Sequence, residues 1–420
     1  MGDKEAPQLA GALQIIYVQE VCTMSNETYS RASEILYRGK SAKGQDYNNP
    51  ASFPLFTNTS FTMSSLAEVR EAYRSKFTYV RTNNPNREAL ADMVSYIENG
   101  EKSLIFSSGM GAITTTLMTV LQPGDHIICN SYIYGETFDV MTKLMRKFGV
   151  ESDLVSFDDL DNVRAAVKPN TKLIYSEVCA NPTMNIADIP NLAEIAHKNG
   201  AYLMIDNTFT TAVAIRPLDF GADIVINSMT KFMNGHSNAI AGSITTTAQL
   251  IDRIQPIQKL CGTPGDPYDA WTIATNLQTV DLRVKKQMAN AAKLAAALEQ
   301  NPYVTKVNHP SLESFPQHEL ALKLFASNET MTGMMSFVVP EEMEKIERFM
   351  GRLHFARYAV TLGGIHTTLN HPVTSSHRRM PDENRRKLGI TPGMFRLSVG
   401  IEEPEDLIRD FYQALEVFGE

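Results

Sequence analysis

Short apolar runs and amphipathic helical stretches alternate along the chain from residue 103 to about residue 280. The apolar runs are rich in branched residues, and they occupy 104–106, 127–129, 172–175, 202–205 and 224–226. This pattern predicts buried strands in a mostly parallel sheet, because helices on both faces shield such strands from water. The stretch from Pro190 to Asn199, followed by Gly200, is typical of the connecting helices. The sequence therefore predicts an α/β fold.

The chain has 420 residues, which suggests two or three structural units at roughly 150 residues each. Residues 1–82 are polar with only short apolar clusters, so we expect an irregular N-terminal arm there. Residues 83–280 contain the alternating pattern and form the predicted α/β domain. Residues 281–420 combine short strands with long helices, which predicts a smaller α+β C-terminal domain. The long helices are expected at 285–300, 341–352 and 403–417.

The charge balance argues against a nucleic-acid partner. The chain has 39 Lys and Arg against 47 Asp and Glu, a net charge of −8, whereas binding a polyanion needs a dense basic face. The uncharged stretch from Ser103 to Gln122 is long enough for a membrane span, but its many Ser and Thr residues favour a strand followed by a buried helix. Four cysteines without disulfide or metal spacing, and a mixed, acidic start, predict a cytoplasmic protein with no membrane partner.

Three chemically distinct groups follow predicted strands, and parallel sheets place their binding sites at the carboxyl ends of strands. The first group is Ser107–Gly111, where small residues would let main-chain N–H groups at a helix N-terminus approach a phosphate. An ordinary tight turn explains this segment equally well when it is taken alone. A dinucleotide-binding oxidoreductase is disfavoured, because Thr114 stands where that motif needs a third glycine or alanine.

Asp206 and Lys231 are the other two groups. Asp206 ends a strand, where its carboxylate either caps a turn or keeps a ring nitrogen protonated. Lys231 follows the next strand, where burial would favour the neutral, nucleophilic amine, although most lone lysines are solvated. Together with Ser107–Gly111, these groups are the phosphate anchor, pyridinium partner and reactive amine that pyridoxal 5'-phosphate (PLP) requires. The combination therefore predicts PLP as the cofactor.

Several segments, in this order along the chain, resemble the Cys/Met-metabolism family of PLP-dependent enzymes. They are Ser107–Met110, Tyr134–Gly135, Asp206–Thr208, Ser228–Phe232 with Asn234–His236, and Arg396–Gly400. The family includes methionine γ-lyase, cystathionine γ-lyase, cystathionine γ-synthase and O-acetylhomoserine sulfhydrylase. Ser108–Ile113 and Ala180–Met184 are most similar to the methionine γ-lyases. The resemblance runs from about residue 50 to the C-terminus and implies the PLP-dependent transferase fold of type I.

The resemblance implies that Lys231 and Tyr134 are the catalytic residues. Lys231 would bind the cofactor covalently and move protons at the substrate α and β carbons. Tyr134 would stack on the cofactor ring and exchange a proton with the leaving γ-substituent, and Asp206 would keep the pyridine nitrogen protonated. The remaining cofactor contacts implied within this chain are Ser108, Gly109, Met110, Thr208, Ser228 and Thr230.

The resemblance also implies a substrate site and a partner subunit. Arg396 would pair with the substrate α-carboxylate, helped by the Thr361 main chain and by Asn181. Tyr79 and Arg81 match a Tyr-x-Arg pair that reaches the phosphate of the neighbouring subunit. A homodimer would then be the smallest active unit, a homotetramer is the usual assembly of the family, and the N-terminal arm would contact the neighbouring subunit.

Four positions depart from the family pattern. Glu136 stands where methionine γ-lyases carry a cysteine, and Asp139 stands where members that handle cystathionine carry an arginine. His366 replaces a glutamate, and Thr275 replaces a common arginine. The lost basic groups argue against cystathionine as the substrate, and Glu136, Asp139 and His366 near the substrate would favour a neutral or cationic γ-substituent. The alternative is that both acids lie on the solvated face of a helix.

No metal site is expected. His366, His371 and His377 are close in the sequence, but their spacings do not match a helical ligand pair and no Cys or carboxylate completes a set. The sequence as a whole predicts a PLP-dependent γ-lyase, which converts a methionine-like or other γ-substituted amino acid into a 2-oxo acid, ammonia and the released γ-group. The alternatives are γ-replacement on O-acyl-homoserine, and a catalytically silent scaffold of the same fold.

Overall fold

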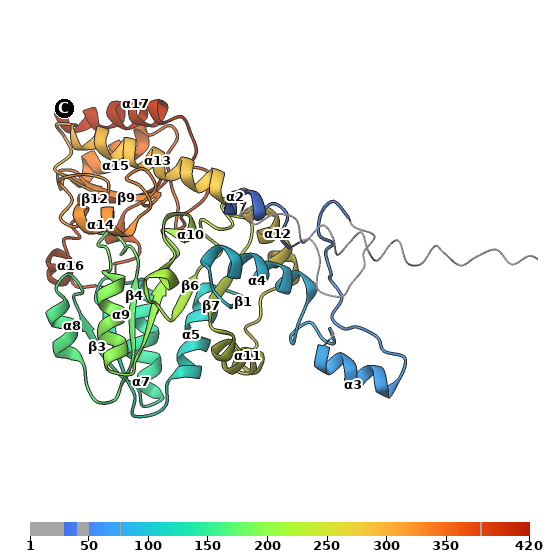
Figure 1. Ribbon diagram of the computed structural model, residues 1–420. Helices are drawn as coiled ribbons and strands as arrows, with labels where there is room; N and C mark the ends of the chain where they lie inside the picture. The colour runs from blue at the N-terminus through green and yellow to red at the C-terminus, as the bar shows by residue number, and fades with distance from the viewer. Residues whose placement is uncertain (1–28, 40–49, 76, 379) are drawn as a thin grey trace, which may run out of the picture.

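The computed structural model describes residues 29–39, 50–75, 77–378 and 380–420. Two parts of the predicted N-terminal arm, 1–28 and 40–49, lie outside the described residues, and Cys22 lies there too. Figure 1 shows two packed units, each built on one sheet, with the C-terminal unit above the larger one.

Seven strands form the larger sheet in the order β1-β7-β6-β5-β4-β2-β3. β6, β5, β4, β2 and β3 are parallel, whereas β7 is antiparallel to both of its neighbours, so the predicted, mostly parallel sheet is confirmed. All five predicted strands are present; β3 and β7 are additional, because their polar sequences contain no apolar run. The strands are β1 Lys102–Phe106, β2 His126–Asn130, β3 Glu151–Val155, β4 Thr171–Glu177, β5 Tyr202–Asp206, β6 Ile224–Asn227 and β7 Gly242–Thr246.

The strands of the larger sheet send alternate side chains into two separate hydrophobic cores. In β4, Ile174 packs into one core, while Leu173 and Tyr175 pack into the other. Burial on both faces explains why these strands appear in the sequence as continuous apolar runs. The first core is covered by α4 (Pro85–Glu98) and α9 (Ile189–Lys198), and the second by α5 (Gly109–Val120) and α11 (Ala248–Cys261).

Five strands form the smaller sheet in the order β10-β11-β12-β9-β8, beneath the predicted C-terminal helices (Figure 1). A cluster of Phe337, Phe349, Phe395 and Phe411, with ring centroids 5.2 to 6.2 Å apart, joins the sheet to these helices. The elements are β8 Lys306–Asn308, β9 Met334–Val338, β10 Arg357–Tyr358, β11 Thr368–Asn370, β12 Met394–Ser398, α13 Val280–Glu299, α15 Met343–Arg352 and α17 Pro404–Leu415.

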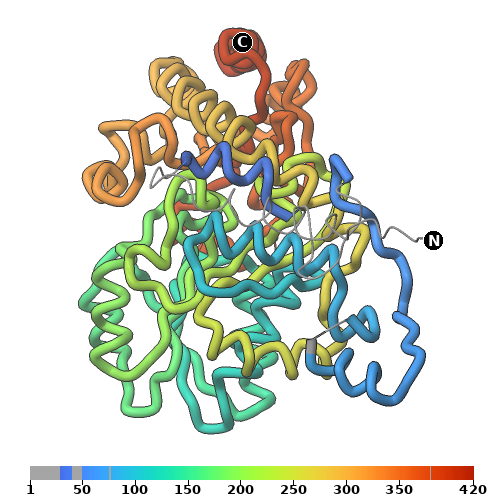
Figure 2. The backbone as a smooth tube through the Cα atoms, turned by 45° about the vertical axis from the view of Figure 1, so that its right-hand side comes forward, coloured from blue at the N-terminus to red at the C-terminus, as the bar shows by residue number. Residues whose placement is uncertain are grey.

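The N-terminal part is more regular than predicted. The expectation of an irregular chain over residues 1–82 is wrong for α3 (Leu66–Ser75), a helix that extends away from the two sheets (Figure 1). Leu66, Val69 and Tyr73 are spaced as on one face of a helix, but the helix is short and lies in a polar part of the chain. The short helix α2 (Arg31–Glu34) lies beside α4 and α13 (Figure 2), and the Arg31 guanidinium forms an ion pair with Asp281 at 3.3 Å.

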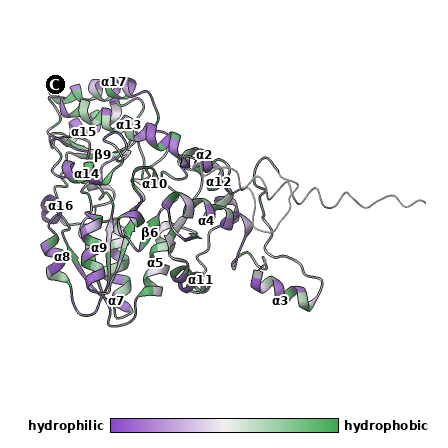
Figure 3. Ribbon diagram, in the orientation of Figure 1, coloured by the Kyte–Doolittle hydropathy of each residue, from purple (hydrophilic) through white to green (hydrophobic). Residues whose placement is uncertain are grey.

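Figure 3 shows apolar residues concentrated on the strands and polar residues on the outer faces of the helices. Among the residues that the structure describes, none of the helices combines the length and the apolar character needed to cross a bilayer. The remaining elements are α6 Gly135–Asp139, a π-helix at Val140–Leu144, α7 Met145–Lys147, α8 Leu160–Ala166, α10 Thr211–Ala214, α12 Pro267–Leu277, α14 His318–Leu324, α16 Asp382–Lys387, and 3-10 turns at Pro217–Phe220, Pro372–Thr374 and Glu416–Gly419.

Candidate active site

The carboxyl ends of β4 and β5 bring two acidic side chains together at one edge of the larger sheet. Glu177 ends β4 and pairs in register with Asp206, which ends β5. One oxygen of Asp206 accepts the Thr208 N–H at 2.9 Å, and the Tyr175 hydroxyl donates to the other at 3.5 Å. Burial raises the pKa of Asp206, while the hydrogen bonds from Thr208 and Tyr175 oppose that rise. The sequence-predicted carboxylate therefore lies at the expected edge, beside a second one.

The turn that begins α5 lies beside Ser228 at the same edge. Ser108 is the N-cap of α5, and its hydroxyl accepts the Gly111 N–H at 3.0 Å. A Cβ on Gly109 would lie 2.9 Å from the Ser228 Cβ, so this close approach requires glycine. The first main-chain N–H groups of a helix have no intrahelical acceptor, and together with the Ser228 hydroxyl they form a cradle for an anion.

Two threonines connect the strand ends that flank this cradle. The Thr208 hydroxyl accepts the Ser228 N–H at 2.8 Å, which ties the end of β5 to the end of β6. The Thr230 hydroxyl exchanges hydrogen bonds with the main chain of Ala241, at 3.2 Å in each direction. Met110 lies on the other side, where its sulfur is 3.8 Å from the Thr137 hydroxyl. The predicted phosphate contacts are therefore brought together in one place.

Lys231 lies where the two units meet. A Cβ on Gly363 would approach the Lys231 carbonyl carbon to 2.7 Å, so the loop after Thr361 packs directly on the Lys231 main chain. The Arg283 guanidinium of α13 stabilises the turn by donating a hydrogen bond to the Phe232 carbonyl oxygen at 3.0 Å. Burial and, to a smaller extent, the Arg396 charge lower the pKa of the Lys231 ammonium. Lowering this pKa increases the fraction of the nucleophilic, neutral amine.

Arg396 is a buried cation from β12 that faces the larger sheet. Its guanidinium donates to the Asn181 side-chain oxygen at 3.4 Å and to the Thr361 carbonyl oxygen at 3.3 Å. Burial lowers the pKa of Arg396 to about 10, and its Nε has no hydrogen-bond partner among the described residues. A buried guanidinium with an unused donor is suited to a carboxylate. The structure thus brings the three predicted substrate-site residues together.

Tyr134 stands at the open side of the site, with 43% of its surface exposed. Its main-chain N–H donates to the Glu177 carboxylate at 2.7 Å, at the point where α6 begins. Burial, followed by a hydrogen bond to the Glu136 carboxylate, raises the pKa of the Tyr134 phenol, and the charge of Arg396 opposes this rise. A raised pKa keeps the phenol protonated, as a proton donor must be.

Glu177 is a site residue that the sequence analysis missed. Its carboxylate is buried, and burial with the adjacent Asp206 charge raises the pKa of Glu177 to about 8. The sequence carries only a weak signal for it: Glu177 follows the apolar run 172–175 after one serine, much as Asp206 follows the run 202–205. Because the two carboxylates are adjacent at one sheet edge, the pair carries less than two negative charges at neutral pH.

Tyr79 and Arg81 do not join this cluster within the chain. Tyr79 pairs with Ser60 through an isolated bridge, and Arg81 lies 5.7 Å from the centre of the Tyr79 ring. The Arg81 guanidinium donates to the main chain of Lys259 at 3.5 Å. Both residues are exposed, so they are available to a second subunit.

Of the four positions that depart from the family pattern, Glu136, Thr275 and His366 are exposed, and Asp139 is half-buried. Asp139 forms an ion pair with Lys143 at 2.6 Å along its own helix, which agrees with the solvated-face alternative for this acid. Thr275 is exposed and donates to its own helix, and His366 is exposed as well. Glu136 alone contacts a predicted catalytic residue, Tyr134.

The histidines show no arrangement for a metal. Both ring nitrogens of His371 are used locally, on Thr374 and on the Pro392 carbonyl oxygen. Burial, and then the charges of Arg396 and Arg385, lower the pKa of His377 to about 4. Within the described ranges, no group of three His, Cys, Asp or Glu side chains could hold a metal ion.

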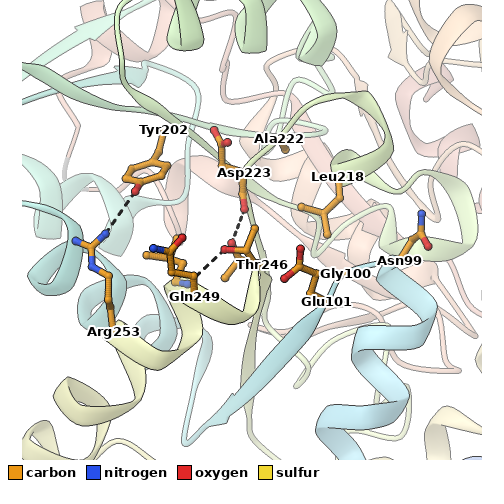
Figure 4. Close-up of a pocket in the computed structure, with 12 residues that line it drawn as sticks. Asn99, Gly100, Glu101, Tyr202, Leu218, Ala222, Asp223, Thr246, Gln249 and Arg253 are labelled. Atoms are coloured by element: carbon orange, nitrogen blue, oxygen red, sulfur yellow. Dashed lines mark hydrogen bonds between the residues drawn. The ribbon is translucent and has the colours of Figure 1, made fainter.

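A cavity of about 400 Å³ lies at the opposite edge of the larger sheet (Figure 4). Its lining includes Glu101, Tyr202 and Asp223, which lie before or at the start of strands that run in the same direction. The Arg253 guanidinium donates to the Tyr202 hydroxyl at 3.4 Å. None of the residues predicted from the sequence for the cofactor or substrate lines this cavity. The chemistry of the chain is therefore concentrated at the carboxyl edge and not in this cavity.

The carboxyl-edge cluster fits PLP on three observations. The main chain of Gly109 lies close to Ser228, and a side chain at position 109 would fill the space of the proposed cradle. Lys231 is a largely buried amine that forms no ion pair in the described part of the chain. Asp206 supplies a carboxylate that would stabilise the positive charge of a protonated ring nitrogen.

Comparison with known proteins agrees with this fit. The family model described as Cys/Met metabolism PLP-dependent enzyme matches residues 35–416. The chain is 37% identical to a cystathionine gamma-lyase of Bacillus subtilis over 374 residues, which cover 89% of this chain and 96% of the relative. It is 35% identical to an L-methionine gamma-lyase of Treponema denticola, with coverage of 86% and 92%.

The fold comparison gives the same family. The crystal structure of cystathionine gamma synthase from Xanthomonas oryzae pv. oryzae, in complex with aminoacrylate and cysteine, superimposes with a TM-score of 0.88 at 29% identity. The match covers 94% of this chain and 99% of that structure. The arrangement of a larger, mostly parallel sheet and a smaller C-terminal sheet is therefore shared along nearly the whole chain.

Proposed function

The chain belongs to the Cys/Met metabolism family of PLP-dependent enzymes, and on this premise we propose that it is a γ-lyase. The proposed reaction is α,γ-elimination on a methionine-like or other γ-substituted amino acid, with a 2-oxo acid, ammonia and the γ-group as products. The observation that carries this proposal is the convergence of Lys231, Tyr134 and Arg396, because the Arg396 charge acts on both of the other groups.

Bound PLP would supply the electron sink that makes the substrate α-hydrogen acidic. Arg396 would hold the substrate carboxylate with the donor that has no partner among the described residues, and Asn181 and the Thr361 main chain would orient the guanidinium. Lys231, with its lowered pKa, would accept and return protons near the α and β carbons. Tyr134, held protonated beside Glu136, would donate a proton to the departing γ-group.

For the substrate, we propose a neutral or cationic γ-substituent. Glu136 places a negative charge beside the Tyr134 hydroxyl, where the γ-group would leave. An anionic substituent, such as the distal carboxylate of cystathionine, would be repelled there and would find no arginine at position 139 or 275. Asp139, which is paired with Lys143, contributes little to this preference.

The second candidate function is γ-replacement on O-acyl-homoserine. The fold match with a cystathionine gamma synthase over 94% of the chain supports it, and the same residues would serve both reactions up to loss of the γ-group. The two reactions differ in whether water or a thiol consumes the resulting intermediate. A silent scaffold is not proposed, because the lysine, aspartate, tyrosine and arginine are all present in one cluster.

A substrate panel with product identification tests the proposal. PLP-loaded protein is incubated with methionine, S-methylated methionine, cystathionine and O-acetyl-homoserine, each with and without cysteine. We expect 2-oxobutyrate and ammonia from methionine and its cationic analogue, and no activity from the Lys231→Ala control. If O-acetyl-homoserine gave a thioether and no 2-oxobutyrate, the function would be γ-replacement and not elimination. Pyruvate from cystathionine as the main product would overturn both functions.

We also propose a homodimer as the smallest active unit, in which Tyr79 and Arg81 serve the phosphate cradle of the neighbour, and a homotetramer as the full assembly. The exposed position of both residues, away from the cradle of their own chain, supports this. Mixing inactive Lys231→Ala with inactive Arg81→Ala protein should restore part of the activity, because some dimers would then contain one intact site. We further propose a cytoplasmic location, since the described cysteines Cys129, Cys179 and Cys261 are free thiols.

A further inference from the structure

Glu98 is a buried acid that the reaction outlined above does not use. It is the last residue of α4, its surface is 0% exposed, and its side-chain hydrogen-bond donors among the described residues are amides. The Asn227 side chain donates to its carboxylate at 2.7 Å, and the Asn207 side chain donates to its two oxygens at 3.3 and 3.4 Å. In the part of the chain that the structure describes, no ion pair within 4.0 Å compensates this carboxylate.

Keeping a carboxylate in such a place is costly. Burial raises the pKa of Glu98 to about 7, against the opposing effects of the Asn227 and Asn207 hydrogen bonds and of the more distant charges of Arg31 and Arg216. An apolar residue would fill the same space without this cost. The position of the two amides suggests what the acid contributes.

Both amides stand at the strand ends that carry the cofactor cluster. Asn207 directly follows Asp206, and Asn227 directly precedes Ser228. The Asn207 main-chain N–H also donates to the Ile226 carbonyl oxygen at 2.8 Å, where β5 ends beside β6. Glu98 therefore connects the segment of the ring-nitrogen carboxylate to the segment of the phosphate cradle through one rigid carboxylate.

We propose that Glu98 is a positioning residue for PLP, which fixes the separation between the Asp206 and Ser228 strand ends by binding Asn207 and Asn227 together. The proposal rests on the assignment of this edge as the cofactor site. Bound PLP would contact both strand ends at once, at its ring nitrogen and at its phosphate, so a small change in their separation would weaken both contacts together.

The test compares Glu98→Ala with Glu98→Gln. Alanine removes the link: the Asn227 amide loses its acceptor, and the Asn207 amide keeps only the Ile215 carbonyl oxygen. Glutamine keeps the length of the side chain: its oxygen accepts from Asn207, and its nitrogen donates to the Asn227 side-chain oxygen once the Asn227 amide has turned over. That oxygen has no partner among the described residues, so the turn breaks no hydrogen bond of the oxygen. Ser95→Ala is the matched control, because Ser95 lies one turn earlier on α4 and bonds Ser103, away from the strand ends.

The affinity of each apoprotein for PLP is measured by titrating the visible absorbance of the bound cofactor, with the position of that band as a second readout. We expect Glu98→Ala to bind PLP about tenfold more weakly and to shift the band, with Glu98→Gln within about threefold of wild type and Ser95→Ala unchanged. Thermal unfolding of the apoproteins separates this effect from a general loss of stability. Asn227→Ala, which removes one side of the link, carries the test if Glu98→Ala does not fold.

Equal PLP affinity of wild type, Glu98→Ala and Asn227→Ala would overturn the positioning role. So would a loss in Glu98→Ala that Ser95→Ala reproduces, because that result would indicate general destabilisation of α4. Failure of the wild-type protein to bind PLP would instead contradict the cofactor assignment itself, and the two failures are therefore distinguishable.

Discussion

The Tyr134 main-chain N–H and the Glu177 carboxylate form a hydrogen bond of 2.7 Å that fixes the start of α6 to the end of β4. The bond connects the proposed proton donor to the sheet edge at which Asp206 lies opposite Glu177. The position of the Tyr134 main chain thus depends on a buried side chain from the neighbouring strand end.

Replacing Glu177 is expected to impair catalysis through Tyr134. Burial and the adjacent Asp206 raise the pKa of Glu177 to about 8, so at neutral pH the residue is mostly protonated and glutamine resembles it. Glu177→Ala should lower kcat/KM by about tenfold to a hundredfold, because the tyrosine loses its anchor, whereas Glu177→Gln should stay within about threefold. Steady-state kinetics on methionine measure both. Equal losses in the two variants would mean that the carboxylate charge, and not the anchor, matters.

Arg396 should affect both substrate binding and the pH profile. Its charge lowers the pKa of the Lys231 ammonium, so loss of the charge in Arg396→Gln should raise that pKa. The basic-amine limb of the kcat profile should then move to higher pH, because kcat reports the substrate complex, in which Lys231 is a free amine. Arg396→Lys keeps the charge but loses the forked donor, so KM should rise by about tenfold while the limb stays in place. A limb that moves equally in both variants would contradict this assignment.

The sequence predicts where Asp206 and Lys231 lie in the fold better than it predicts parts of the framework around them. Asp206 and Lys231 follow strands that are apolar on both faces, and such strands and the residues after them are visible in the sequence. β7 carries a glycine, a serine and two threonines and so shows no apolar run, and α3, in which four of ten residues are charged, is a single short helix within a polar stretch. Glu177 was missed because an acid at a strand end resembles a turn residue until the neighbouring strand places Asp206 beside it. Long-range pairing of this kind requires the folded structure.

Acid should destabilise the fold through His309. The ring is buried between Ser311 and the Thr332 carbonyl oxygen, and burial lowers its pKa from 6.5 to about 4. As the pH falls below 6.5, the unfolded chain binds a proton that the folded chain does not bind until about pH 4, so stability decreases across this window. The loss should reach on the order of 3 kcal/mol.

Urea unfolding between pH 7 and pH 4 measures this loss. His309→Gln should show a smaller decrease than wild type, since glutamine can still donate to Thr332 but does not titrate. His366→Asn is the matched control, because His366 is exposed and its replacement should leave the pH dependence unchanged. A wild-type slope in His309→Gln would show that other groups cause the acid sensitivity.

Glu136 should set the charge preference for the γ-substituent. Its carboxylate lies beside the Tyr134 hydroxyl, whereas Asp139, one turn later, is paired with Lys143. Glu136→Gln should therefore reduce the ratio of kcat/KM for S-methylated methionine over methionine by about three- to fivefold, a modest effect because water screens an exposed charge. Asp139→Asn, which removes a charge of the same sign from the same helix, should leave the ratio unchanged. The effect of Glu136 should also shrink as salt is added. If both substitutions changed the ratio equally, the preference would arise from the net charge of the helix and not from the contact with Tyr134.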